Sequence, residues 1–200
     1  AAASKALKWN SSADGFETGD VAGAMVLLET QTASSDGTLD FTSGIDDTYD
    51  SYVFKFIDCH PSAANPAFQF NLSIDAGSNY NVTKTTTMVN ATHEEDDGGA
   101  VLTYNTYNDL SQSTGFQNLA TYVGNGNDET TSGTLQLFNP SSTTFVKHFI
   151  HNGNEYAGND QSINYFVAGY GNTTSAVDAI QFKFASGNID AGVIKLYGIS

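Results

Sequence analysis

Apolar and polar side chains alternate with a period of two in the first half of the chain. Tyr52, Phe54 and Phe56 fall on one side of a first segment, and Phe68 and Phe70 open a second segment of the same kind. A period of two with aromatic residues on one side is typical of a β-strand with one buried face. This region therefore predicts two strands that contribute to a hydrophobic core.

The same alternation recurs up to the C-terminus and predicts about a dozen strands. Turn segments rich in Gly, Asn and Asp separate them, as expected of residues that accept positive φ or bond their own backbone. No helical periodicity lies between the strands, which favours a sandwich over βαβ units. We predict an all-β fold, a jelly-roll-like antiparallel β-sandwich formed by residues 23–200 as one domain. The expected strands are 23–31, 37–42, 51–59, 67–75, 84–93, 101–107, 119–123, 133–138, 143–151, 163–170, 176–185 and 190–198.

The first 22 residues show no sustained alternation and are expected to form an N-terminal arm. Residues 1–13 contain Lys5 and Lys8 and no acid, whereas the rest of the chain has five lysines and 22 acids, a formal charge of −17. Two interpretations are open. The arm is either a disordered terminus or an inter-subunit connector whose residues Lys5, Leu7, Lys8 and Trp9 dock on a neighbouring copy.

Composition limits the classes of function. The 24 aromatic residues (13 Phe, 10 Tyr and 1 Trp) can supply a large core, and the net charge is −15. All seven bases are lysines, so the chain lacks the basic face and the arginines with which proteins usually contact phosphates, and no nucleic-acid partner is expected. No apolar run approaches the roughly 20 residues needed to span a bilayer, and no membrane span is expected.

Two clusters of acidic residues are weak candidates for Ca²⁺, a cation that takes six to eight oxygen ligands. Neither cluster has the spacing of a defined calcium loop, and solvated turns with local capping bonds are the competing interpretation. No other cofactor is expected. The candidate metal ligands are Asp46, Asp47, Asp50, Glu94, Glu95, Asp96 and Asp97.

No set of catalytic residues is evident, and we expect a protein that is not an enzyme. His148 and His151 should lie on opposite faces of one strand, and His60 has no partner at a zinc-ligand spacing. The chain has no Gly-x-Ser-x-Gly motif. Paired carboxylates for glycoside cleavage depend on distances in space, so a glycosidase stays open as the least favoured alternative.

Asn-x-Ser/Thr triplets mark candidate glycosylation sites. Asn71 falls on the polar side of its strand, so a glycan there is expected to point outward. Such triplets also arise by chance in a chain this rich in Ser, Thr and Asn. The only cysteine, Cys59, ends an apolar strand and is expected to be buried, with an intermolecular disulfide as the alternative. The candidate sites are Asn10, Asn71, Asn81, Asn90 and Asn172.

Three longer stretches carry a family resemblance. They are FTSGIDDTYDSYVFKFIDCHPSAANPAFQF, LFNPSSTTFVKHFI and AGYGNTTSAVDAIQFKFASGNIDAGVIKLYGIS. From about Met25 to Ser200 the chain resembles an uncharacterised family of structural proteins found in tailed phages of marine and fresh waters and in environmental sequences. The resemblance implies a tail-fibre or virion-surface β domain, or a subunit of free extracellular filaments, and it brings no catalytic residues.

These observations favour a non-enzymatic structural subunit that assembles into a homopolymeric filament or a phage fibre. The arm would link neighbouring protomers, and the protein would be extracellular or on a virion surface. The start Ala-Ala-Ala is compatible with a processed N-terminus. A module that binds carbohydrate or a receptor is the alternative, with cell-surface glycans as partners.

Overall fold

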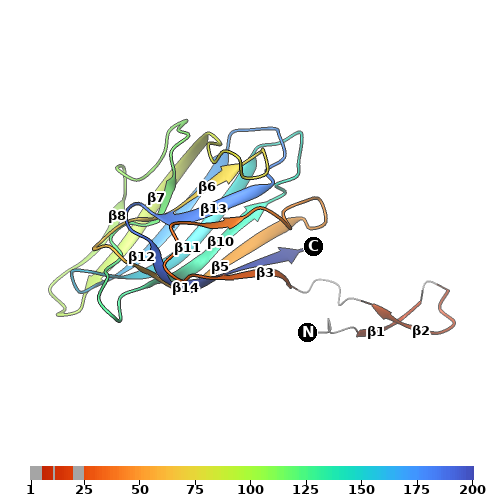
Figure 1. The fold of residues 1–200 in the computed structure, drawn as a ribbon, viewed down its shortest axis with the longest axis horizontal. Coiled ribbons are helices and arrows are strands. Elements are labelled where there is room, and N and C mark those ends of the chain that lie inside the picture. The colour runs from red at the N-terminus through yellow and green to blue at the C-terminus, as the bar shows by residue number, and fades with distance from the viewer. Residues whose placement is uncertain (1–5, 11, 20–24) are drawn as a thin grey trace.

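The computed structural model describes residues 6–10, 12–19 and 25–200, which form strands and turns without a helix (Figure 1). Two antiparallel sheets pack face to face as a β-sandwich, and a separate two-stranded hairpin precedes them. The predicted all-β sandwich is confirmed.

The larger sheet has eight strands and the smaller has four. In spatial order the larger sheet consists of β3 (Val26–Thr32), β14 (Ile189–Ile199), β5 (Ser51–Pro61), β10 (Thr131–Phe138), β11 (Lys147–Ala157), β12 (Gln161–Gly171), β7 (Lys84–Glu94) and β8 (Ala100–Tyr104). The smaller sheet consists of β4 (Leu39–Phe41), β13 (Ala179–Phe184), β6 (Phe68–Ser73) and β9 (Gln117–Ala120). The separate hairpin consists of β1 (Ala6–Trp9) and β2 (Phe16–Gly19).

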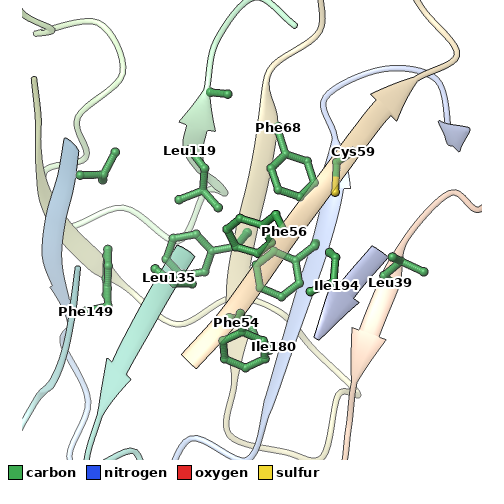
Figure 2. Packing of buried hydrophobic residues seen from close by; sticks show 14 of the residues in the cluster. Leu39, Phe54, Phe56, Cys59, Phe68, Leu119, Leu135, Phe149, Ile180 and Ile194 are labelled. Carbon is green, nitrogen blue, oxygen red and sulfur yellow. The ribbon is translucent and has the colours of Figure 1, made fainter. Parts of the chain in front are cut away.

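Aromatic rings fill the space between the two sheets (Figure 2). The predicted inward residues Tyr52, Phe54 and Phe56 of β5 are almost fully buried. Phe182 of β13 lies at the centre of the cluster, because alternation along this strand points it inward. Its ring centroid lies 5.1–6.4 Å from those of five other rings, at Phe41, Phe54, Phe56, Phe68 and Phe70. Rings at these separations add favourable pair contacts to the burial of apolar surface.

One predicted strand is displaced from its true position. The expected strand 143–151 is found as β11, which begins at Lys147 and continues to Ala157. Asn152-Gly153-Asn154 is typical of a turn, but here Gly153 pairs with Gly133 across β10 and β11. A Cβ atom on Gly133 would lie 2.6 Å from the Gly153 Cα atom. The glycines are therefore required by the close approach of two strands, rather than by a turn.

The prediction that the polar side of β6 faces solvent is wrong. Asn71 and Ser73 are fully buried, because the segments around Tyr80 and Thr114 cover the side of the strand that faces away from the core. Ile74, which continues the alternation of Phe68 and Phe70, follows the strand and is 42% exposed. Loops thus close a face that the alternation alone assigned to solvent.

The aromatic cluster predicts a large difference between two phenylalanine variants. Phe182→Ala should lower the free energy of unfolding by about 3–5 kcal/mol, because it removes a ring that touches five others. Phe145→Ala, at a ring that is 69% exposed, should change it by less than about 0.5 kcal/mol. Urea unfolding followed by circular dichroism would measure both, and similar losses would contradict the packing described.

Candidate functional site

The hairpin of β1 and β2 carries three large apolar side chains on its surface. Leu7 is 73% exposed, Trp9 60% and Phe16 63%. Trp9 and Phe16 are directly opposite each other in the register, and their rings stack with centroids 4.5 Å apart. Neither strand pairs with a strand of the sandwich within the described residues, and the hairpin projects from the body (Figure 1). The predicted arm residue Lys8 lies in β1, while Lys5 lies outside the described residues.

Local sequence explains why this segment forms a hairpin. Asn10 Nδ2 donates to Asp14 Oδ1 at 2.8 Å, and the Asn10 amide donates to the Gly15 carbonyl at 3.0 Å. Asp-Gly is a common signal for a hairpin turn, and Leu-Lys-Trp and Phe-Glu-Thr alternate on either side of it. The sequence prediction of an arm missed the two strands, although this dipeptide could have indicated them.

The strand β8 forms one open edge of the larger sheet. It pairs with β7 through the register Val89–Tyr104 to His93–Ala100, and it is the last strand in the sheet order. All five of its residues, Ala-Val-Leu-Thr-Tyr, are exposed, including Val101 at 54% and Leu102 at 76%. An edge strand presents backbone N–H and C=O groups without a strand partner, and an uncharged apolar edge favours pairing with another chain.

The acidic loop before β8 makes local bonds that shape its turn. The Gly98 amide donates to Asp96 Oδ1 at 2.8 Å, and Gln161 Nε2 donates to Glu94 Oε1 at 3.1 Å. Glu95 and Asp97 are exposed as well, and His93 Nε2 lies 3.3 Å from Asp97 Oδ1. Among the described residues, no group of three or more His, Cys, Asp or Glu side chains is arranged to hold a metal ion.

The second acidic cluster also acts through local bonds. The Thr48 amide donates to Asp46 Oδ1 at 2.9 Å, and the buried Tyr52 hydroxyl donates to the same oxygen at 3.0 Å. The Thr48 side chain contributes most to lowering the Asp46 pKa, and the Thr48 amide contributes next. Asp47 and Asp50 are exposed in the same loop. The competing interpretation of a capped turn describes this geometry, and the Ca²⁺ hypothesis gains no support from either cluster.

A shallow apolar groove lies on the outer face of the larger sheet and runs across β7, β12 and β11 to the end of β10. Two adjoining hollows of about 450 and 480 Å³ share Phe138 and His148 in their linings. Tyr170 and Phe145 add aromatic surface, and the His148 and Tyr170 rings meet edge to face at 6.1 Å. No carboxylate or lysine lines the groove, so it suits a flat, uncharged ligand surface.

A buried polar cluster joins β11 to β12 and the β9 region. The Tyr165 hydroxyl donates to Glu155 Oε1 at 2.7 Å, and burial of the carboxyl group raises the pKa of Glu155 to about 7. His151 is 3% exposed, with ring nitrogens 2.9 and 3.1 Å from the carbonyl oxygens of Thr134 and Leu119. Burial lowers the pKa of His151 to about 4. These groups link the layers of the sandwich.

Two lysines are also fully buried. The Lys84 ammonium donates to the Val82 carbonyl at 2.8 Å and to Asn71 Oδ1, and burial lowers its pKa to about 7. Lys147 donates to the carbonyl oxygen of Phe145 at 2.7 Å. Both interactions hold loop backbone against the sandwich, a role that the sequence did not reveal.

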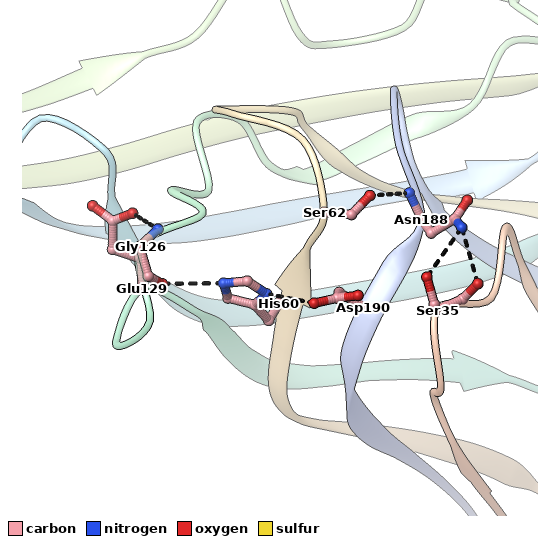
Figure 3. Close-up of polar contacts among 7 residues, drawn as sticks. All are labelled: Ser35, His60, Ser62, Gly126, Glu129, Asn188 and Asp190. Carbon is pink, nitrogen blue, oxygen red and sulfur yellow. Dashed lines mark hydrogen bonds and ion pairs between the residues drawn. The ribbon is translucent and has the colours of Figure 1, made fainter.

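His60 and Cys59 have structural positions at the end of β5. His60 Nε2 lies 3.0 Å from the Gly126 carbonyl oxygen and Nδ1 lies 3.8 Å from Asp190 Oδ2, so the ring bridges the loop at Gly126 and the start of β14 (Figure 3). Asn188 joins the Ser62 loop to Ser35 in the same region. Cys59 is fully buried, as expected, and burial raises the pKa of its thiol to about 12. An intermolecular disulfide through Cys59 is therefore disfavoured.

The candidate glycosylation sites differ in accessibility. The expectation that a glycan on Asn71 points outward is wrong, because Asn71 is fully buried and its Nδ2 donates to the carbonyl oxygens of Tyr80 and Thr114. Asn81 and Asn172 are exposed, whereas Asn10 and Asn90 are partly buried. Asn172 Nδ2 also donates to Gln112 Oε1 at 2.8 Å.

Comparison with known protein families, curated proteins and solved structures finds no match to this chain. The phage-fibre resemblance is therefore neither supported nor contradicted by a relative. In the part of the chain that the structure describes, no helix has the length and apolar character needed to cross a membrane.

The buried Glu155 predicts a pH dependence of stability. Its folded-state pKa is raised from 4.5 to about 7, so its contribution to stability is fully present below pH 4.5 and is lost as pH rises to about 7. Glu155→Gln removes this titration. The free energy of unfolding of the native protein, minus that of the variant, should fall across this window by on the order of 3 kcal/mol.

Urea unfolding at several pH values between 4 and 8, followed by circular dichroism, would test this. Taking the difference between the two proteins cancels the opposite trend from His151, whose lowered pKa makes stability increase with pH between about 4 and 6.5. Parallel stability curves for the two proteins would show that Glu155 titrates normally.

Proposed function

We propose that this protein is a non-enzymatic structural subunit that associates head to tail into a homopolymeric extracellular filament or a phage-fibre-like virion appendage. The observation that carries the proposal is the projecting hairpin with Leu7, Trp9 and Phe16 on its surface. The hairpin links one protomer to the next. The family resemblance of residues 25–200 supports the same class of function.

The hairpin has little to hold it together when it is alone. A two-stranded sheet in water is at best marginally stable, and it needs a third strand or a packed face. The stacked pair of Trp9 and Phe16 covers only part of the apolar surface. A partner that covers the exposed side chains would gain roughly 25 cal/mol for each Å² of apolar surface removed from water.

Charge also favours contact through the arm. Residues 14–200 have a formal charge of −17, so bodies repel one another at low ionic strength. Residues 1–13 carry two lysines and no acid, so the charge of this segment is opposite to that of a neighbouring body. A contact between unlike surfaces that does not close on itself produces an open helical filament.

The jelly-roll interpretation of the fold belongs with this proposal. Eight strands cross between the two sheets in the chain order β3, β4, β5, β6, β9, β10, β13 and β14, and we infer that they form the jelly roll. The hairpins β7–β8 and β11–β12 then extend the larger sheet beyond it. This extension places β8 at one edge of the larger sheet. The strand that follows the N-terminal hairpin, β3, is at the other edge.

The double variant Trp9→Ser, Phe16→Ser should abolish or weaken assembly while the sandwich stays folded. Each aromatic anchor at an interface contributes at least about 1–2 kcal/mol, so the critical concentration for polymerisation should rise at least tenfold. Negative-stain microscopy and sedimentation would measure this. Phe166→Ser, at a ring that is 46% exposed on the sandwich, is the matched control and should polymerise normally. Unchanged filaments from the double variant would contradict the proposal.

A carbohydrate-binding module is the second candidate, and the groove around Phe138, His148 and Tyr170 favours it. Aromatic faces there are open to stacking with a sugar ring. Binding to an array of cell-surface glycans should be lost in Tyr170→Ala and kept in Trp9→Ser. Absence of binding across a broad array would contradict the carbohydrate-binding function and favour the structural role.

A further inference from the structure

We infer that the open edge of β8 receives β1 of the next copy, so that the larger sheet continues from one protomer into another. This inference rests on the proposed head-to-tail assembly and names its acceptor surface. The exposed apolar hairpin and the exposed apolar edge are separate features of the same chain. Strand addition would pair the backbone groups of both and cover their side chains.

β8 differs from the other edges of the two sheets in the described residues. β3 contains Glu29, and Gln31 of the same strand donates to the Asp40 carbonyl oxygen of β4, which ties part of that edge to the smaller sheet. β4 carries Asp40 and has three residues, and β9 is mostly buried. Among these four edge strands, β8 alone combines an uncharged sequence with an exposed residue at every position. β8 has five residues and β1 has four, so the two strands are similar in length.

Aromatic surface extends from the last residue of β8, Tyr104, into the segment that follows the strand. Tyr104 is 50% exposed and Tyr107 is 96% exposed. The side chains of Leu7, Trp9 and Phe16 would find apolar and aromatic neighbours along this edge. Cross-strand pairs of aromatic and aliphatic residues contribute to the stability of such a junction.

Charge is complementary at the other end of β8. The loop Glu94–Asp97, with four consecutive carboxylates, comes just before Ala100. In β1, Lys8 lies between Leu7 and Trp9, and Lys5 precedes the strand in the sequence. Lysines within β1 and before it therefore carry the charge opposite to that of the acidic loop beside β8. Complementary charge of this kind mainly raises the rate of association and fixes the orientation.

The position of β8 in the sheet makes the contact intermolecular. The hairpin leads into β3, and β8 is at the opposite edge of the same sheet. Seven strand spacings place β8 about 33 Å from β3. The connection from Gly19 to Val26 spans at most about 24 Å when fully extended. The hairpin thus cannot lie beside its own β8, and an arm at one edge with an acceptor at the other gives a contact that does not close.

Engineered disulfides would test the acceptor with the full-length chain. Ala6→Cys protein is mixed with each of the single variants Val101→Cys, Leu102→Cys, Thr103→Cys and Tyr104→Cys, and assembly is followed by mild oxidation. Cys59 is buried, with a pKa raised to about 12, and does not compete. Because a disulfide needs Cβ atoms within about 4.5 Å, strand addition predicts strong cross-linking at one position of β8 and at least tenfold less at its immediate neighbours.

A rival acceptor is included in the same experiment. Thr144→Cys reports the outer groove. Filaments whose Ala6→Cys chains cross-link to Thr144→Cys, or evenly along β8, would overturn this inference and leave the proposed function intact. Intact protein that stays monomeric at all concentrations would instead overturn both.

Neutralising the acidic loop provides a second readout. The variant Glu94→Gln, Glu95→Gln, Asp96→Asn, Asp97→Asn keeps the hydrogen-bond acceptors of the turn and removes its charge. We expect it to elongate several-fold more slowly than the native protein in low salt, with the difference lost at high salt. Asp46→Asn, Asp47→Asn, Asp50→Asn is the matched control and should elongate at the native rate. Equal slowing of both variants would contradict a specific role for the loop.

Discussion

Two strands cannot bury the apolar side chains that they carry, because a hairpin has no interior. In the sandwich, a sheet of eight strands packs against a sheet of four, and the aromatic rings are buried between them. Within the described residues, the N-terminal hairpin pairs with neither sheet, and it presents Trp9, Phe16 and Leu7 to solvent. The proposed assembly follows from this contrast between a closed body and an open appendage.

The same constraint explains the importance of the sheet edges. Most edges of the sandwich are short, charged or covered, which protects them from pairing with other chains. The β7–β8 hairpin extends the larger sheet past the smaller one and ends in a strand with five exposed, uncharged residues. The proposed assembly needs one unprotected edge and one strand to fill it: β8 is that edge, and the hairpin that carries β1 precedes β3 at the opposite edge of the same sheet.

The sequence predicted the sandwich well because alternation is directly visible in strands such as β5 and β13, whose inward residues are Phe, Tyr and Ile. It failed where inward positions hold small or polar residues. In β11 the inward positions include Gly153 and Glu155, so the strand resembled a turn. Asn71 was misassigned because loops from elsewhere in the chain cover it, and no local pattern shows such a contact.

The candidate surfaces were predictable only in part. Charge and composition singled out Leu7 and Trp9 as arm residues, but the short strands around Asp14-Gly15 were missed. A strand near Val101 was expected, yet its position at an edge depends on the order of strands in space, which periodicity does not contain. The acidic loop was visible in the sequence, and its position beside the open edge was not.

Trp9 is the only tryptophan of the chain, so its fluorescence reports on the hairpin alone. The most direct measurement is its emission maximum and its quenching by acrylamide across the concentration at which filaments form. The account predicts red-shifted, strongly quenched emission from dilute monomers, and blue-shifted, protected emission from filaments. Filaments whose tryptophan remains as accessible as in the monomer would contradict the claim that the hairpin joins the subunits.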